Sequence, residues 1–175
     1  MKKWLAIIFS LLIVASMSGC TSQASVPNGK DGTDATLEIG SEERQRMDLY
    51  IEVMKAAFEE ENGGHTFIAI KLDTLEELSD LAKEEVMKAF TSISVNVYDF
   101  EDIRDDNTKF EKNDKGLTRT IEGALLWVEV EEYYDRKATI TGVSWFGNLG
   151  AVFPTYEATY KNGMWQLKLI RMAVS

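Results

Sequence analysis

Residues 123–174 read GALLWVEVEEYYDRKATITGVSWFGNLGAVFPTYEATYKNGMWQLKLIRMAV, and this run carries the main structural signal of the chain. Apolar and polar side chains alternate along it, which is the pattern of β-strands with one buried face. Asn162-Gly163 separates the last two strands, and both residues tolerate the positive φ angles of a two-residue type I′ turn. We therefore expect an antiparallel meander, with strands over about 126–131, 138–146, 152–161 and 164–174.

Two amphipathic helices are predicted before these strands. Ser41 is the expected N-cap of the first helix, which Gly63-Gly64 ends. The second is capped by Thr74 or Ser79 and runs to about Thr91. Apolar residues recur at helical spacing in both: Met47, Tyr50, Ile51, Met54, Ala57 and Phe58 in the first, and Leu75, Leu78, Leu81, Ala82, Val86 and Phe90 in the second.

The segments between and after the helices are shorter. Residues 65–72 predict one strand, and the alternation of Ile93, Val95 and Val97 predicts another. Residues 101–122 are highly charged and are expected to form a loop or a poorly formed helix. Because one face of the meander must be covered and only the helices can cover it, we expect an α+β fold. In this fold, two N-terminal helices pack on a curved, cone-like antiparallel sheet.

The N-terminus has the pattern of a secretion signal. Lys2 and Lys3 precede a nearly continuous apolar run over residues 4–17, which is too short for an ordinary membrane span. Met17-Ser18-Gly19-Cys20 follows, and it resembles the lipobox of bacterial lipoproteins. The resemblance implies that residues 1–19 are a signal peptide cleaved after Gly19 and that Cys20 is acylated. The alternative is an ordinary signal peptide with an incidental cysteine.

A lipid anchor would place the protein at the extracytoplasmic face of the cell membrane, with membrane lipid as its first partner. Burial of each acyl methylene contributes about 0.8 kcal/mol, so two chains give stable attachment. Residues 20–40 are rich in Ser, Thr, Gly and Asp and are predicted to be a flexible tether with a reach of about 25 Å. Residues 41–175 then form a single domain.

Charge and cysteine content exclude some roles. The net charge is −10, and it becomes −12 when Lys2 and Lys3 leave with the signal peptide. Such a surface repels nucleic acid, so no nucleic-acid partner is expected. Cys20 is the one cysteine of the sequence, so the domain is expected to be stabilised by its hydrophobic core without an internal disulfide.

The C-terminal half also carries a family resemblance. Trp145-Phe146-Gly147-Asn148-Leu149-Gly150-Ala151, followed by Tyr160-Lys161-Asn162-Gly163-Met164-Trp165, resembles small uncharacterised lipoproteins and secreted proteins of Bacillus-type Gram-positive bacteria. Helices first and a bent sheet last are similar to the cone-shaped nuclear transport factor 2-like (NTF2-like) and cystatin-like folds. The resemblance implies a fold class and a Gram-positive origin, and it transfers no activity or site residue.

The sequence gives no catalytic, metal or cofactor site. His65 is the one histidine, and an exposed or capping role is favoured over catalysis or metal binding. The acidic run 102–107 lacks the ligand spacing of an EF-hand loop. Glu129 and Glu131 are expected on one strand face, with Glu132 on the other, in cross-strand ion pairs.

An apolar connection over residues 145–154 gives the candidate surface for a ligand or partner. It contains two glycines, so a packed hairpin or bulge is the alternative. Its candidate residues are Trp145, Phe146, Leu149, Phe153 and Tyr156. A curved sheet could also form a cavity lined by some of the aromatic residues Trp127, Tyr133, Trp145, Tyr156, Tyr160 and Trp165.

Three functions fit these features. The first is a non-catalytic binding module that holds a protein, a peptide or a wall component. The second is an immunity, inhibitor or exclusion lipoprotein that binds one cognate protein. The third is a small-pocket NTF2-like isomerase or hydrolase, which would need a carboxylate in the cavity with a raised pKa.

The anchor is tested by Cys20→Ala. Without the thiol no lipid can be attached, so the variant should be released into the medium or remain unprocessed, as measured by membrane fractionation and mass analysis of its N-terminus. Unchanged membrane fractionation of a processed variant would contradict the lipoprotein prediction.

Overall fold

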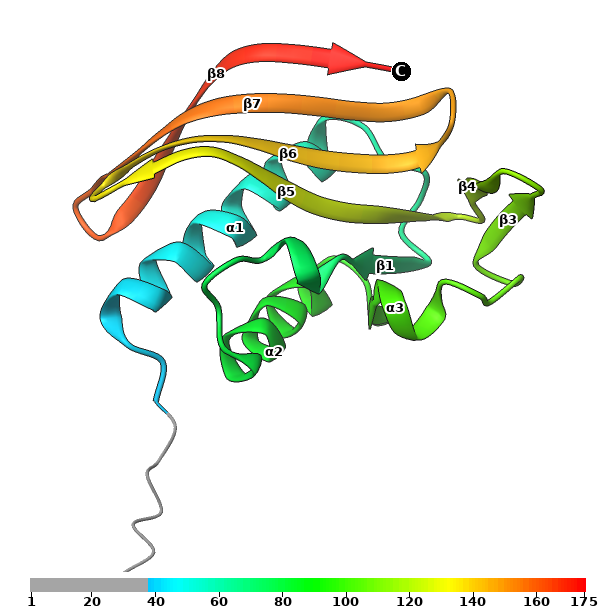
Figure 1. Ribbon diagram of the computed structural model, residues 1–175, viewed down its shortest axis with the longest axis horizontal. Helices are drawn as coiled ribbons and strands as arrows, with labels where there is room; N and C mark the ends of the chain where they lie inside the picture. The colour runs from blue at the N-terminus through cyan, green and yellow to red at the C-terminus, as the bar shows by residue number, and fades with distance from the viewer. Residues whose placement is uncertain (1–37) are drawn as a thin grey trace, which may run out of the picture. The chain divides into compact units, whose positions relative to one another are not determined.

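The computed structural model describes residues 38–175 (Figure 1). Gly19, Cys20, the predicted signal peptide and most of the predicted tether lie outside this range. Within it, no helix combines the length and the apolar character needed to cross a membrane.

The chain forms an α+β fold with its helices mostly before a strand-rich sheet, as predicted (Figure 1). The helices are α1 (Ser41–Glu60), α2 (Asp80–Ala89) and α3 (Phe100–Ile103). The strands are β1 (Phe67–Ile70), β2 (Val97–Asp99), β3 (Phe110–Asn113), β4 (Gly116–Thr120), β5 (Gly123–Tyr134), β6 (Lys137–Gly147), β7 (Gly150–Lys161) and β8 (Met164–Val174).

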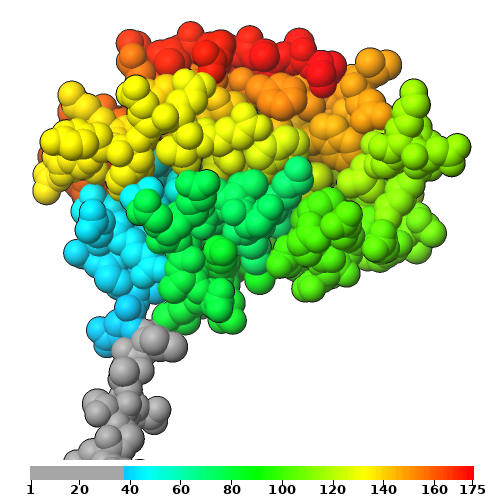
Figure 2. Space-filling model, in the orientation of Figure 1, coloured from blue at the N-terminus to red at the C-terminus, as the bar shows by residue number. Residues whose placement is uncertain are grey.

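The strands form one eight-stranded mixed sheet. β5, β6, β7 and β8 pair antiparallel in sequence order, which confirms the meander. The prediction of a wholly antiparallel sheet is wrong, because β1 pairs parallel with both β2 and β5. Parallel neighbours need a crossover connection, and α2 lies in the connection from β1 to β2. β8 pairs only with β7 and forms one rim of the domain, red in Figure 2.

Two shorter segments differ from the predictions. The strand expected around Ile93 begins only at Val97, and Val95 is 89% exposed. The region 101–122, predicted as a loop or a poorly formed helix, contains the end of the four-residue helix α3 and then the β3–β4 hairpin, which was not predicted. Only Phe110 of β3 is buried, so this strand lacks the alternation by which a strand is recognised in sequence.

The helix ends follow ordinary capping chemistry. The N-cap of α1 is Gly40, and Ser41 is the first helical residue, which corrects the prediction by one position. Ser79 caps α2, since its hydroxyl accepts a hydrogen bond from the Ala82 backbone N–H at 3.3 Å.

Two hydrophobic clusters hold the domain together. The main core includes residues of α1, α2 and one face of β1, β5 and β6, among them Tyr50, Met54, Val86, Leu126 and Ile140. The outer core comprises Phe67, Ala69, Phe100, Phe110 and Leu125. Phe110 packs edge-to-face on Phe67 and Phe100. All four residues of β1 are buried, as expected for a strand covered on both faces.

A bulge in β5 changes the predicted arrangement of its glutamates. The register with β6 shifts between Val130 and Glu132, so that Glu129 pairs with Thr141 and Glu132 with Thr139. Glu129 and Glu132 therefore share a face, and Glu131 is the bulged residue. Its carboxylate pairs with Arg171 of β8, a strand that is not a neighbour of β5 in the sheet. Neither Glu129 nor Glu132 forms an ion pair among the described residues, so the predicted pairing with neighbouring strands is not found.

The β7–β8 hairpin joins the end of the chain to its first helix. Asn162 and Gly163 both have positive φ, at 54° and 81°, which confirms the predicted turn. Trp165 follows on β8 and is 8% exposed, with its ring against those of Tyr133 and Tyr160. Its indole N–H donates a 2.7 Å hydrogen bond to the Gln45 carbonyl of α1.

Trp165→Ala should destabilise the domain by about 3–5 kcal/mol, because it removes a buried aromatic ring. Trp165→Phe keeps an aromatic ring and loses the bond to Gln45, so a smaller loss of about 1–3 kcal/mol is expected. Urea unfolding of both variants measures the difference. Equal stability of Trp165→Ala and the parent protein would contradict the packing of β8 on α1.

Candidate functional site

Two hollows lie on either side of the turn between β6 and β7. The first, here called the tryptophan pocket, has a volume of about 260 Å³. It is lined by Lys71, Phe100, Leu117, Leu125, Trp127, Trp145 and Asn148. The second, here called the turn hollow, is wider at about 740 Å³. Its lining includes Gly63, Arg119, Phe146, Asn148, Leu149 and Gly150. Asn148 lines both, so the two hollows meet at this residue.

Strand geometry brings the two tryptophans together. Leu125 and Trp145 are direct cross-strand partners on β5 and β6, and Trp127 is two residues further along β5. Residues two apart on a strand share a face, so both indoles project from the outer face of the sheet. The cover provided by α3 and the β3–β4 hairpin ends here, and it leaves Trp127 and Trp145 half-buried.

Lys71 gives the tryptophan pocket its charge. It follows the last residue of β1, and its ammonium nitrogen lies 4.1 Å from the centre of the Trp127 ring and 5.7 Å from that of Phe100. Such contacts are cation–π interactions. The indole N–H of Trp127 donates a 3.1 Å hydrogen bond to the Glu129 carboxylate, which sets the orientation of the ring.

Glycines shape the turn hollow. A β-carbon on Gly150 would lie 2.5 Å from Cε2 of Phe146, and one on Gly63 would lie 2.5 Å from Cβ of Phe146. Real side chains do not approach so closely, so Phe146 can pack here only because both positions are glycine. The residues between β6 and β7, Asn148 and Leu149, are exposed, and Leu149 is 94% exposed.

Four of the five residues predicted as a ligand or partner surface lie outside the main core. Trp145 lines the tryptophan pocket, whereas Phe146 and Leu149 line the turn hollow. Phe153 is half-buried on β7, opposite Ala173 of β8. Tyr156 is a correction, because it is 5% exposed within the main core and offers no surface to a partner.

The predicted aromatic cavity is also corrected in part. Trp165, Tyr156, Tyr133 and Tyr160 belong to or pack against the main core, where α1 and apolar side chains occupy the inner side of the sheet. Trp127 and Trp145 face the other way and pack against the outer core. The aromatic residues are thus divided between the two faces.

Asn148 lies in the predicted 145–154 connection, but sequence reasoning missed Lys71, Phe100, Leu117 and Leu125 as pocket residues. They come from four separate segments of the chain, and no local pattern relates them. The one available signal was that Trp127 and Trp145 each lie in a segment where apolar and polar residues alternate.

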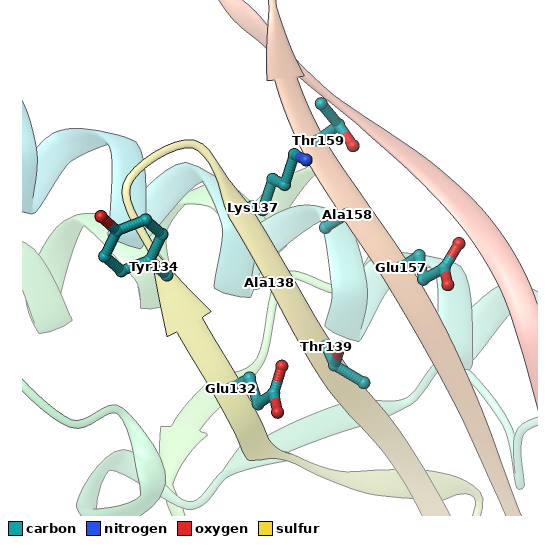
Figure 3. Close-up of a pocket in the computed structure, with 8 residues that line it drawn as sticks. All are labelled: Glu132, Tyr134, Lys137, Ala138, Thr139, Glu157, Ala158 and Thr159. Atoms are coloured by element: carbon teal, nitrogen blue, oxygen red, sulfur yellow. The ribbon is translucent and has the colours of Figure 1, made fainter.

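A third hollow lies on the outer face at the opposite end of β6, with a volume of about 470 Å³ (Figure 3). Glu132 and Glu157 stand on either side of Thr139 in it. Glu157 pairs with Lys168 at 3.0 Å, and both side chains are exposed. This is the cross-strand ion pairing expected of a solvated sheet face.

His65, Asp106 and Asp48 lie outside these three hollows. His65 is exposed and packs edge-to-face with Phe58, with ring centres 5.0 Å apart. In the acidic run, hydrogen bonds from Lys109 and Thr108 lower the pKa of Asp106 to about 2. Burial raises the pKa of Asp48 on α1. Among residues 38–175, no group of three or more His, Cys, Asp or Glu is placed to hold a metal ion.

Comparison of the chain with known protein families, characterised proteins and solved structures finds no match.

Gly150→Ala should disturb the turn hollow, since the added β-carbon would force the Phe146 ring to move. Overpacking of this kind costs about 1–3 kcal/mol, measurable by urea unfolding. Gly147→Ala is the matched control on the same turn, because its β-carbon would meet Cβ of Arg119 at 3.4 Å and nothing closer. Equal effects of the two substitutions would contradict the packing of Phe146 against Gly150.

Proposed function

We propose that this protein is a lipid-anchored, extracytoplasmic binding module without catalytic activity. Its tryptophan pocket and turn hollow hold a protein, a peptide or a wall component. The anchor is acylated Cys20, attached through the tether to the domain. The immunity, inhibitor or exclusion role is the special case in which the partner is one cognate protein.

The position of the two hollows supports this proposal most strongly. The chain enters the domain at the N-terminus of α1, which has 20 residues and is therefore about 30 Å long. Gly63, just beyond the other end of α1, lines the turn hollow. The turn between β6 and β7 lies at the opposite end of the domain from the start of α1 (Figure 1), and residues of this turn line both hollows. A partner could reach them without interference from the attachment point.

The chemistry of the hollows also suits binding. Ligand sites are concave and mostly apolar, with a few polar groups that fix orientation. The tryptophan pocket combines aromatic and aliphatic walls with one ammonium and one amide, from Lys71 and Asn148. Its volume of about 260 Å³ lies below the usual range of sites for drug-sized ligands, so it is suited to one end group of a larger partner.

The finer fold assignment is part of this proposal. Packing of α1 beside the curled β5–β7 sheet supports a likeness to the cone-shaped NTF2-like and cystatin-like domains (Figure 1). The enzymatic alternative requires a carboxylate inside such a cone. Within the part of the chain that the structure describes, the buried polar residues are Ser94, Thr120, Thr141, Ser144 and Thr155, and none is acidic.

Site-specific photo-crosslinking of the full-length, membrane-anchored protein tests the proposal. A benzophenone side chain at Leu149 should give one saturable adduct, because this residue projects from the turn hollow. Tyr134 is the matched control, since it is 83% exposed at the other end of β5.

The adduct at Leu149 should be lost in Trp145→Ala, provided that circular dichroism shows a folded domain. No adduct at Leu149, or equal adducts at both positions, would contradict a binding site at this end of the sheet.

A further inference from the structure

We infer that the tryptophan pocket recognises a carboxylate attached to an aromatic or apolar group, with Lys71 as the residue that binds the anion. This inference rests on the proposed binding function and names the chemical class of its ligand.

Among the described residues, Lys71 lines the tryptophan pocket without an acidic partner, whereas three cations of the neighbouring segment from α3 to β4 are paired. Arg119 is paired with Glu111, Lys109 with Asp106, and Lys112 with Asp105. Within residues 38–175, neither an ion pair nor a hydrogen bond engages the Lys71 ammonium, whose described neighbours are aromatic rings. In a chain with net charge −10, an ammonium without a carboxylate partner, lining a pocket, is a local site of attraction for anions.

The backbone holds Lys71 in place. Its N–H donates to the Leu126 carbonyl at 3.0 Å, and its own carbonyl accepts the Thr74 backbone N–H at 3.2 Å and the Thr74 hydroxyl at 2.8 Å. The side chain is half-buried, and the rings of Trp127 and Phe100 limit where its ammonium can lie. A group held in this way loses little conformational freedom on binding, which favours affinity.

The walls of the pocket select what accompanies the carboxylate. Trp127, Trp145 and Phe100 present aromatic surfaces, and the Glu129 carboxylate engages the edge of the Trp127 indole, whereas Lys71 lies over its face. A flat apolar group can stack on these rings while its carboxylate reaches Lys71. The volume of about 260 Å³ accommodates one aromatic side chain.

The rest of a larger ligand can extend out of the tryptophan pocket. Asn148 forms part of the wall of both hollows, so a chain leaving the tryptophan pocket would pass over it into the turn hollow. Two sources share this chemistry: the C-terminal residue of a peptide and a free aromatic acid.

Tryptophan fluorescence titration of the acylated full-length protein in nanodiscs tests the inference, with empty nanodiscs as the blank. The probes are N-acetyl-L-phenylalanine, its uncharged amide and phenylacetate. We expect the acid to bind about tenfold more tightly than the amide, because only the acid carries a negative charge that can form an ion pair with Lys71. Added salt should weaken binding of the acid more than that of the amide.

Three variants assign the preference to Lys71. Lys71→Gln should abolish the difference between acid and amide, and Lys71→Arg should retain it. Lys55→Gln is the matched control, since Lys55 also lies over an aromatic ring, that of Phe90 at 5.8 Å, outside this pocket. Phenylacetate binding as tightly as N-acetyl-L-phenylalanine would indicate a free aromatic acid as the ligand, and weaker binding would indicate a peptide C-terminus.

Equal affinity for acid and amide in the parent protein, no response to either probe, or an undiminished preference in Lys71→Gln would overturn the inference. An adduct at Leu149 that persists alongside any of these results would leave the binding function standing and remove only the ligand class. Loss of the adduct with an intact carboxylate preference would instead show a small-molecule site without the proposed macromolecular partner.

Discussion

Burial of the first half of β5 on both faces is the constraint on which the rest of the domain depends. Leu126 faces the main core and Leu125 the outer core, while β1 and β6 pair with the two edges of the strand. Two covers are therefore needed: the long helices on one face, and α3 with the β3–β4 hairpin on the other. The second cover is short. Where it ends, Trp127 remains half-buried, and the tryptophan pocket forms at this boundary.

Close approach of backbones sets how tightly these layers pack. A β-carbon on Gly142 of β6 would lie 2.6 Å from the Val53 carbonyl of α1, and one on Gly123 would lie 2.4 Å from the Phe67 ring. Glycine at these two places lets α1 lie directly against β6 and lets Phe67 cover the start of β5. The same principle operates at the turn hollow, where Gly63 and Gly150 make room for Phe146.

Electrostatic interactions contribute less to the fold than burial does. Most ion pairs of the described residues join exposed side chains, such as Lys168 with Glu157 and Arg104 with Glu101, and pairs of this kind contribute about 0–1 kcal/mol. The negative surface mainly favours solubility. Against this background a cation without an acidic partner in an aromatic pocket stands out, and Lys71 is for that reason the residue on which the ligand class rests.

The sequence by itself determined both long helices, the four strands of 123–174 and the Asn162-Gly163 turn, because side-chain periodicity and turn preference act over a few neighbouring residues. It also indicated the 145–154 region as the place of interest. Only the tertiary structure decided that β1 lies parallel to β5, that the bulge at Glu131 reorders its neighbours and that Tyr156 faces inward. The pocket around Lys71 was likewise decided only by the tertiary structure. Each of these features depends on register or on contacts between distant segments, which no local pattern encodes.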